Sequence, residues 1–174
     1  MKTNIYNELK GKISELNKIN DEINLIEWNK DDGPKFTSVE EMKEFENKVI
    51  NGELDYIFDE ETTNTKGEML KTEEITKDDY FFYIYTYKRK DEFITYLTIK
   101  DLKSNEILQN VCGNVSNNKN DELSYNESLT NDIKNNTIDY IFNRIITDID
   151  KNISELKKKY EELTNASESF FISI

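Results

Sequence analysis

The segment from Tyr80 to Lys88 restricts the possible folds of this chain more than any other, because it is apolar on both of its faces. Side chains of a strand alternate between the faces, which here carry Phe81, Tyr83, Tyr85 and Tyr87 on one side and Phe82 and Ile84 on the other. A strand of this kind has to be covered twice. Helices of the same chain can cover one face. The face of Tyr83, Tyr85 and Tyr87 is expected either to pack against another helix or to bind a partner.

The residues that follow predict an antiparallel sheet. Lys90 and Asp91 form a tight turn into 92–100, a second segment rich in aromatic and β-branched side chains. The two segments therefore make a β-hairpin. A further turn leads to a third strand, which is expected at 106–115.

The residues before the hairpin add to this sheet. Alternation of side chains at 53–58 predicts a short strand, and the polar stretch 59–67 predicts an exposed loop. The sheet is therefore expected over about residues 53–115, as a meander of three to five strands.

Helical periodicity flanks the sheet on both sides. Apolar residues recur every three or four positions over 3–29 and over 124–163, which predicts two long amphipathic helices. A shorter helix is expected over 38–50. Its start reads as a capping box, in which the hydroxyl of Thr37 accepts from the first turn and Glu40 reaches back.

Together these elements predict one α+β domain that covers residues 1–174. In this fold an antiparallel β-meander packs against long N- and C-terminal helices and one shorter helix. A chain of 174 residues has room for one hydrophobic core. The short apolar tail at 164–174 is expected to dock as a strand or on a partner.

The sequence also predicts a location. No signal peptide is recognisable near the N-terminus, and no apolar run approaches membrane-spanning length, so we expect no membrane association. Lysine greatly outnumbers arginine, which occurs only as Arg89 and Arg144, as is typical of an AT-rich bacterial or phage genome. We therefore expect a cytoplasmic protein, in the cytoplasm of a bacterial host if a phage encodes it.

The absence of histidine argues against an enzyme. It removes the commonest general base, the Ser-His and Cys-His nucleophiles and nearly all zinc sites. The five glycines form no phosphate-binding loop, and the single Cys112 cannot form an internal disulfide. We expect no catalytic residue, no cofactor and no metal site.

Charge is the strongest functional signal in the sequence. The net charge is −13, and residues 31–80 contribute most of it, with sixteen acidic and six basic side chains. Carboxylates at this density face water and generate a negative field, which disfavours direct binding of nucleic acid. The candidate acidic binding residues are Asp55, Asp59, Glu60, Glu61, Glu73, Glu74, Asp78 and Asp79.

The leading hypothesis is a non-enzymatic binding protein whose acidic surface blocks a basic site on another protein. Enzymes that handle nucleic acid present such sites, and carboxylates spaced like phosphates can occupy them; phage-borne inhibitors of host defence fit this description. A second hypothesis is a structural or assembly protein that oligomerises through its long helices. A third is an immunity-type protein that neutralises a toxin, which shares the physics of the first.

Overall fold

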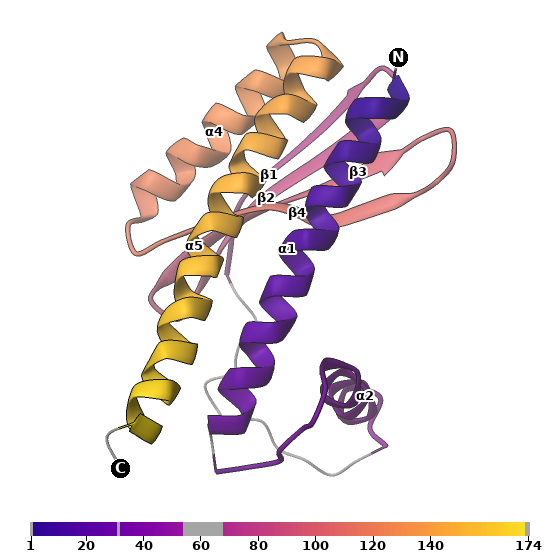
Figure 1. Ribbon diagram of the computed structural model, residues 1–174. Helices are drawn as coiled ribbons and strands as arrows, with labels where there is room; N and C mark the ends of the chain where they lie inside the picture. The colour runs from indigo at the N-terminus through magenta and orange to yellow at the C-terminus, as the bar shows by residue number, and fades with distance from the viewer. Residues whose placement is uncertain (1, 31, 54–67, 173–174) are drawn as a thin grey trace.

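A computed structural model describes residues 2–30, 32–53 and 68–172 of the chain. Within them, four helices and a four-stranded antiparallel sheet form an α+β fold, and the strands follow the order β1-β2-β3-β4 (Figure 1). The predicted fold class, the meander and the long terminal helices are confirmed.

The sheet consists of two hairpins joined in sequence order. Its strands are β1 Glu68–Lys77, β2 Tyr80–Arg89, β3 Glu92–Asp101 and β4 Ile107–Ser116. The predicted turn between β2 and β3 is present, and Lys90 adopts a φ of 56° there. A positive φ lets a two-residue loop follow the twist of its strands. Apart from Glu53, the strand expected at 53–58 lies outside the described residues, as does the loop expected at 59–67.

The N-terminal third of the chain forms α1 Lys2–Lys30 and α2 Val39–Ile50. The capping box of α2 lies one residue later than predicted. Ser38 is the N-cap and its side chain accepts from the backbone N–H of Glu41 at 3.1 Å. The Glu41 carboxylate in turn accepts from the backbone and the hydroxyl of Thr37, at 3.0 and 2.6 Å.

The single helix expected at 124–163 is wrong, because two helices occupy this region. They are α4 Lys119–Asn135 and α5 Ile138–Ile172. Asn136 has extended backbone angles, and Thr137 then caps the new helix by accepting the backbone N–H of Tyr140 at 3.2 Å. The chain reverses at this break, so that α4 and α5 form a helical hairpin (Figure 1).

A strand at 164–174 is also wrong for the residues that the structure describes, whereas docking of this apolar segment on a partner stays a prediction. Helix α5 continues through this segment to Ile172. Neither glycine nor proline occurs between Ile138 and Ile172, so the sequence contains no strong signal that would end the helix earlier.

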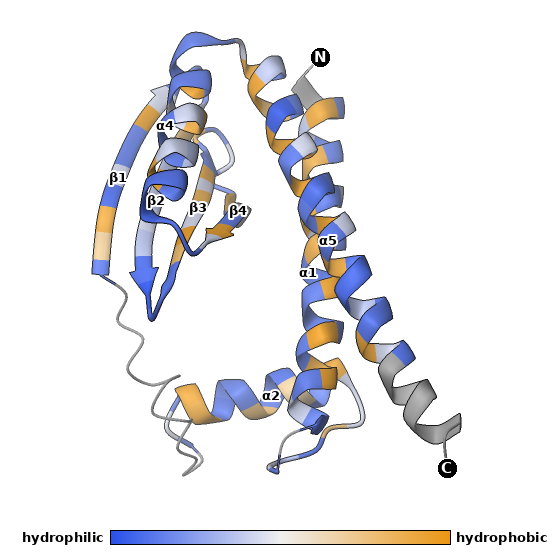
Figure 2. Cartoon of the chain, turned by 90° about the vertical axis from the view of Figure 1, so that its left-hand side faces the viewer, coloured by the Kyte–Doolittle hydropathy of each residue, from blue (hydrophilic) through white to orange (hydrophobic). Residues whose placement is uncertain are grey.

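One hydrophobic core fills the space between the sheet and three helices. Helices α1, α4 and α5 all lie on the same side of the sheet (Figures 1 and 2). Each layer contributes fully buried side chains to this core, among them Leu9, Phe82, Ile84, Leu97, Ile99, Leu129, Ile133, Phe142, Ile145 and Ile149. The inner face of the sheet is therefore covered by the chain itself.

The two longest helices, α1 and α5, lie side by side and run in the same direction (Figure 1). Ion pairs join them along their length, with 2.8 Å between Lys12 Nζ and Asp150 Oδ1 and 2.9 Å between Lys159 Nζ and Glu27 Oε1. Despite their length, none of the helices that the structure describes has an apolar stretch that could cross a bilayer.

Helix α2 packs at the far end of α1, where both long helices extend past the sheet (Figure 2). Trp28 of α1 meets Phe36 and Phe45 edge to face, at centroid distances of 5.6 and 5.9 Å. The Trp28 indole N–H also donates to Glu46 of α2 at 3.0 Å. The fold thus leaves a concave side that is bounded by the sheet, the long helices and α2.

Candidate binding surface

The two faces of the sheet differ in what covers them. In β2, Phe82 and Ile84 are fully buried under the helices, whereas Tyr83, Tyr85 and Tyr87 alternate with them and are half-buried. These tyrosines lie on the side of the sheet opposite to the core that α1, α4 and α5 form with Phe82 and Ile84. We call this side the open face. Within the described residues, the aromatic strand is covered once rather than twice.

Four tyrosines form a cluster on the open face, and three of them are stacked. The rings of Tyr83 and Tyr85 are 5.3 Å apart between centroids and those of Tyr85 and Tyr87 are 6.1 Å apart, with interplanar angles of 29° and 20°. Tyr96 of β3 lies opposite Tyr85 in the ladder, and its ring is 5.9 Å from that of Tyr85 and 6.2 Å from that of Tyr87. We call these four residues the tyrosine cluster.

The surroundings of the tyrosine cluster are apolar and electrically balanced. Cross-strand partners share a face, so the ladder places further side chains beside the cluster. Three large apolar residues there are between 51 and 55% exposed: Met69, Ile107 and Val115. The charged residues that the ladder places on this face are Glu74, Arg89, Glu92 and Lys100. They comprise two carboxylates and two cations.

Burial perturbs two phenols of the cluster. It is the main cause of the raised pKa of Tyr85, and the phenols of Tyr96 and Tyr83 raise this pKa further. Burial likewise raises the pKa of Tyr87, while Arg89 lowers it in part. A tyrosine phenol is already protonated near neutral pH, and the raised pKa values of Tyr85 and Tyr87 extend to higher pH the range in which both can donate hydrogen bonds.

The predicted acidic residues are only partly described. Asp55, Asp59, Glu60 and Glu61 lie outside the described residues. Glu73 and Glu74 are consecutive in β1 and therefore point to opposite faces. Glu74 lies on the open face opposite Tyr83, whereas Glu73 lies on the helix side, 4.0 Å from Lys134 Nζ.

The other two predicted acidic residues lie in the turn between β1 and β2. Asp78 is exposed and has a φ of 51°. The carboxylate of Asp79 lies 3.4 Å from Lys103 Nζ, in the turn before β4. The four described candidates thus occupy the open face, the helix side and a turn, so the fold does not bring them together on one surface.

A polar network that the sequence analysis did not identify lies between α4 and the inner face of the sheet. Its members are Thr86, Thr95, Asn114, Glu122, Asn126 and Thr130. The Thr95 hydroxyl donates to Glu122 Oε2 at 2.6 Å, and the Asn114 side-chain amide donates to the other carboxylate oxygen. The Asn126 amide donates to the Thr86 hydroxyl, which lies 2.7 Å from the hydroxyl of Thr95.

Glu122 is fully buried, and this burial raises its pKa even though the hydrogen bonds from Thr95 and Asn114 lower it. A buried carboxyl group with a raised pKa is a typical candidate for acid-base catalysis. Here both oxygens are engaged, and the side chain has no exposed surface from which to meet a substrate. The arrangement supports a structural role, in which the hydrogen bonds of Glu122 join α4 to the sheet.

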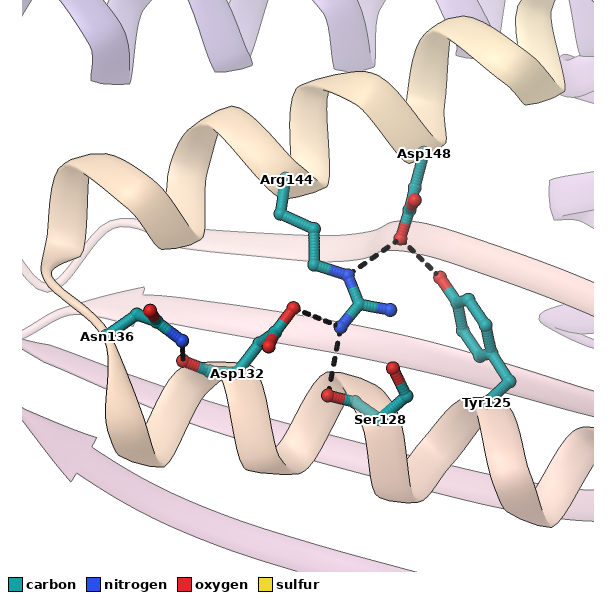
Figure 3. A network of polar contacts seen from close by, with 6 residues as sticks. All are labelled: Tyr125, Ser128, Asp132, Asn136, Arg144 and Asp148. Atoms are coloured by element: carbon teal, nitrogen blue, oxygen red, sulfur yellow. Dashed lines mark hydrogen bonds and ion pairs between the residues drawn. The ribbon is translucent and has the colours of Figure 1, made fainter.

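A second polar network joins α4 to α5 around Arg144 (Figure 3). The guanidinium donates to Asp132 at 2.7 Å and to the backbone carbonyl of Ser128 at 2.9 Å. Its Nε lies 3.6 Å from Asp148, which also accepts from the Tyr125 hydroxyl at 2.9 Å. This network connects the two arms of the helical hairpin.

Three hollows follow the concave side of the molecule. The first, of about 440 Å³, lies between β4 and the α1–α5 pair and includes Tyr96 of the tyrosine cluster in its lining. The second, of about 390 Å³, lies between β4, α4 and α5 and shares Asn114 and Asn152 with the first. The third, of about 410 Å³, lies between α1 and α2 and shares Asn17 with the first. Neighbouring hollows thus share lining residues.

Among the described residues, no three histidine, cysteine, aspartate or glutamate side chains lie close enough together to hold a metal ion. Comparison with protein-family models, with curated proteins and with solved structures finds no match to this chain.

Proposed function

We propose that this protein is a non-enzymatic binding protein that docks its open face on a basic site of another protein and blocks that site. One observation carries the proposal: a cluster of four tyrosines, three of them stacked, lies half-buried on the sheet face opposite to the core that α1, α4 and α5 form. An aromatic patch that remains open to solvent is typical of a surface that a partner completes.

The stacked arrangement suits binding. Tyrosine provides a large contact area together with a hydroxyl group, and it loses little conformational entropy when it is immobilised. The rings of Tyr83, Tyr85 and Tyr87 already restrict each other, so most of that entropy is lost before a partner arrives. Truncating a tyrosine at the centre of such an interface typically costs about 2 kcal/mol or more of binding free energy.

The charge of the whole molecule selects the partner. The open face itself is balanced, so local ion pairs are not the source of affinity. The net charge of −13 creates a longer-range field, which speeds the approach of a basic surface and repels nucleic acid. Enzymes that handle nucleic acid carry basic sites of this kind, and we therefore assign the partner to that class.

The assembly hypothesis receives less support than the proposed function, and the immunity hypothesis receives the same support. Assembly through the long helices would need free apolar seams, whereas α1 and α5 pack against each other within the chain. An immunity-type protein that neutralises a toxin would use the same open face and the same field. Identifying the partner separates this third hypothesis from the first.

Affinity capture from a lysate of the native host tests the proposal. The baits are the wild-type chain, a Tyr85→Thr/Tyr87→Thr variant and a Tyr140→Ala variant, each at low and at physiological salt. Threonine is well accepted in strands, so the double variant keeps the sheet. Tyr140 is a matched control, because it is 50% exposed on α5, away from the open face.

We expect a basic protein that wild type and Tyr140→Ala retain and that Tyr85→Thr/Tyr87→Thr loses. Capture should weaken at the higher salt concentration, because salt screens the field. A partner that all three baits retain equally would contradict the proposal. Circular dichroism of the three baits should show that each is folded.

A further inference from the structure

The two edges of the sheet are protected to different degrees. The strand order leaves β1 at one edge and β4 at the other. Charged side chains on an edge strand discourage another strand from adding to it. Strand β1 carries five of them: Glu68, Lys71, Glu73, Glu74 and Lys77. Strand β4 contains neither a charged residue nor a proline over its ten positions. It therefore lacks this protection.

A bulge limits the usable edge of β4 to its second half. In the ladder, Leu97 pairs with Cys112 and Ile99 pairs with Leu108, so three residues of β4 face one residue of β3. Such a bulge disrupts the regular edge and prevents pairing there. The pairing is regular from Cys112 to Ser116. Among the strands that the structure describes, none pairs with the outer side of these five residues, so their outward backbone groups are those of an edge strand.

The first hollow lies directly beside this stretch. Asn114 and Val115 of β4 line it on one side, and α1 and α5 line it on the other with Leu16 and Leu156. Tyr96 links the hollow to the tyrosine cluster. A chain that paired with β4 would thus lie in a groove lined by both apolar and polar side chains, next to the open face.

The charge of the hollows beside β4 specifies the occupant. The two hollows that share Asn114 of β4 are lined by two lysines, Lys151 and Lys159, and by three carboxylates, Asp121, Asp148 and Glu155. Some lining residues pair with groups outside the hollows, namely Asp148 with Arg144 and Lys159 with Glu27. When these are set aside, two carboxylates and one lysine remain, and the whole chain carries a net charge of −13. A second copy of this acidic chain is disfavoured, and a basic segment is favoured.

We infer that the 112–116 edge of β4 accepts an extended basic segment of the partner as an additional strand. This inference rests on the proposed function and adds to it the conformation of the bound segment. Main-chain hydrogen bonds to β4 hold the segment, and its alternate side chains are of two kinds. Apolar side chains contact Tyr96 and Val115, while lysine or arginine side chains face the carboxylates of the hollows.

Amide hydrogen exchange of the full chain with a synthetic probe tests this inference. The probe is a capped octapeptide of alternating lysine and valine, and the charge-matched control is an octapeptide of alternating lysine and proline, which cannot form a strand. We expect the lysine–valine peptide to slow exchange of backbone amides within 112–116 by about tenfold or more. We expect the lysine–proline peptide to leave them unchanged. Equal effects of both peptides, or no slowing at millimolar peptide, would overturn the inference.

Two variants of β4 sharpen the test. Val115→Lys places a cation on the edge and should abolish the protection, whereas Val115→Thr keeps a good strand former there and should retain it. The partner captured by wild type distinguishes the two proposals. If Val115→Lys binds that partner as wild type does while Tyr85→Thr/Tyr87→Thr does not, strand addition is overturned and the proposed function stands. If Tyr85→Thr/Tyr87→Thr also binds it as wild type does, the proposed function fails.

Discussion

The carboxyl group of Glu122 is fully buried in the folded protein. Loss of hydration disfavours its charged form, and the hydrogen bonds from Thr95 and Asn114 offset only part of this effect, so its pKa is raised above 4.5. The folded state therefore binds this proton more tightly than the unfolded chain does.

Replacing Glu122 with glutamine should remove a pH-dependent loss of stability. In the wild type, the contribution of Glu122 is fully present below the unfolded pKa of about 4.5 and is lost as the pH rises through the raised folded pKa. Glutamine cannot ionise, and the Asn114 amide can rotate to accept from its NH₂ group. The free energy of unfolding of Glu122→Gln, measured in urea against wild type from about pH 4 to 8, should therefore increase relative to wild type with pH.

Glu106→Gln is a control for which we expect a stability difference of the opposite sign. The carboxylate of Glu106 accepts from the Tyr6 hydroxyl at 2.7 Å and pairs with Lys10 at 3.1 Å, and these contacts lower its pKa. Its contribution is present above the unfolded pKa and is lost as the pH falls through the folded pKa. The variant should be less stable than wild type near neutral pH, and the difference should close on acidification. Differences of the same sign for both variants would contradict these assignments.

The network around Glu122 was only partly predictable. Glu122 and Asn126 lie on the same face of α4 as Leu129 and Ile133, so extending the helical period backwards would have reached them. Burying a carboxylate is unfavourable unless it finds partners, and this favours an exposed position when the sequence is considered alone. Thr95 precedes Glu122 by 27 residues, and only the tertiary fold brings the two together.

At the scale of elements, the break between α4 and α5 was hidden by periodicity. Ile133 and Ile141 are eight residues apart, which is about 2.2 turns of an α-helix. In one continuous helix the two would lie near the same face, so the apolar pattern continues across the break. Thr137 is an acceptable N-cap, but the sequence offers no glycine or proline beside it to mark an end. Long-range contacts decide where the helix stops, and Arg144 supplies several of them.

Arg144→Met should weaken the junction of α4 and α5. The variant keeps much of the side-chain length but removes the guanidinium that donates to Asp132 and adds a second hydrogen bond to the Ser128 carbonyl. Hydrogen bonds to charged groups contribute about 1.5–3 kcal/mol each at most, and partial exposure reduces this, so we expect a loss of about 1–3 kcal/mol in urea unfolding. Arg89→Met, at the end of β2, is the matched control and should change stability by less than about 0.5 kcal/mol. Equal losses in both variants would remove the role assigned to Arg144.

The β2–β3 hairpin, in contrast, followed directly from the sequence. Aromatic and β-branched residues on both sides of Lys90 and Asp91 set the strands and their turn locally. The same pattern predicts that both faces of β2 are covered, but it does not identify the element that covers each face. The answer depends on helices α1, α4 and α5, which pack on the side of Phe82 and Ile84 and leave Tyr85 and its neighbours half-buried. This placement is the main feature of the candidate site that local sequence could not determine.

At the scale of the whole molecule, charge should govern how fast a partner arrives. Replacing Asp59, Glu60, Glu61, Glu73 and Glu74 with their amides removes five negative charges and reduces the net charge from −13 to −8. Stopped-flow association with the captured partner should slow by about tenfold at low salt, while the dissociation rate changes little. The difference should vanish at high salt, where the field is screened. An unchanged association rate at low salt would contradict electrostatic steering.

The central claim is that the open face is the surface that a partner covers, and footprinting by hydroxyl radicals tests it most directly. Oxidation of individual tyrosines would be measured by mass spectrometry in the free chain and in the complex with the captured partner. The account predicts strong protection of Tyr85, Tyr87 and Tyr96 in the complex and unchanged oxidation of Tyr140. Oxidation of the three cluster tyrosines that is the same with and without partner, together with protection at Tyr140, would contradict it.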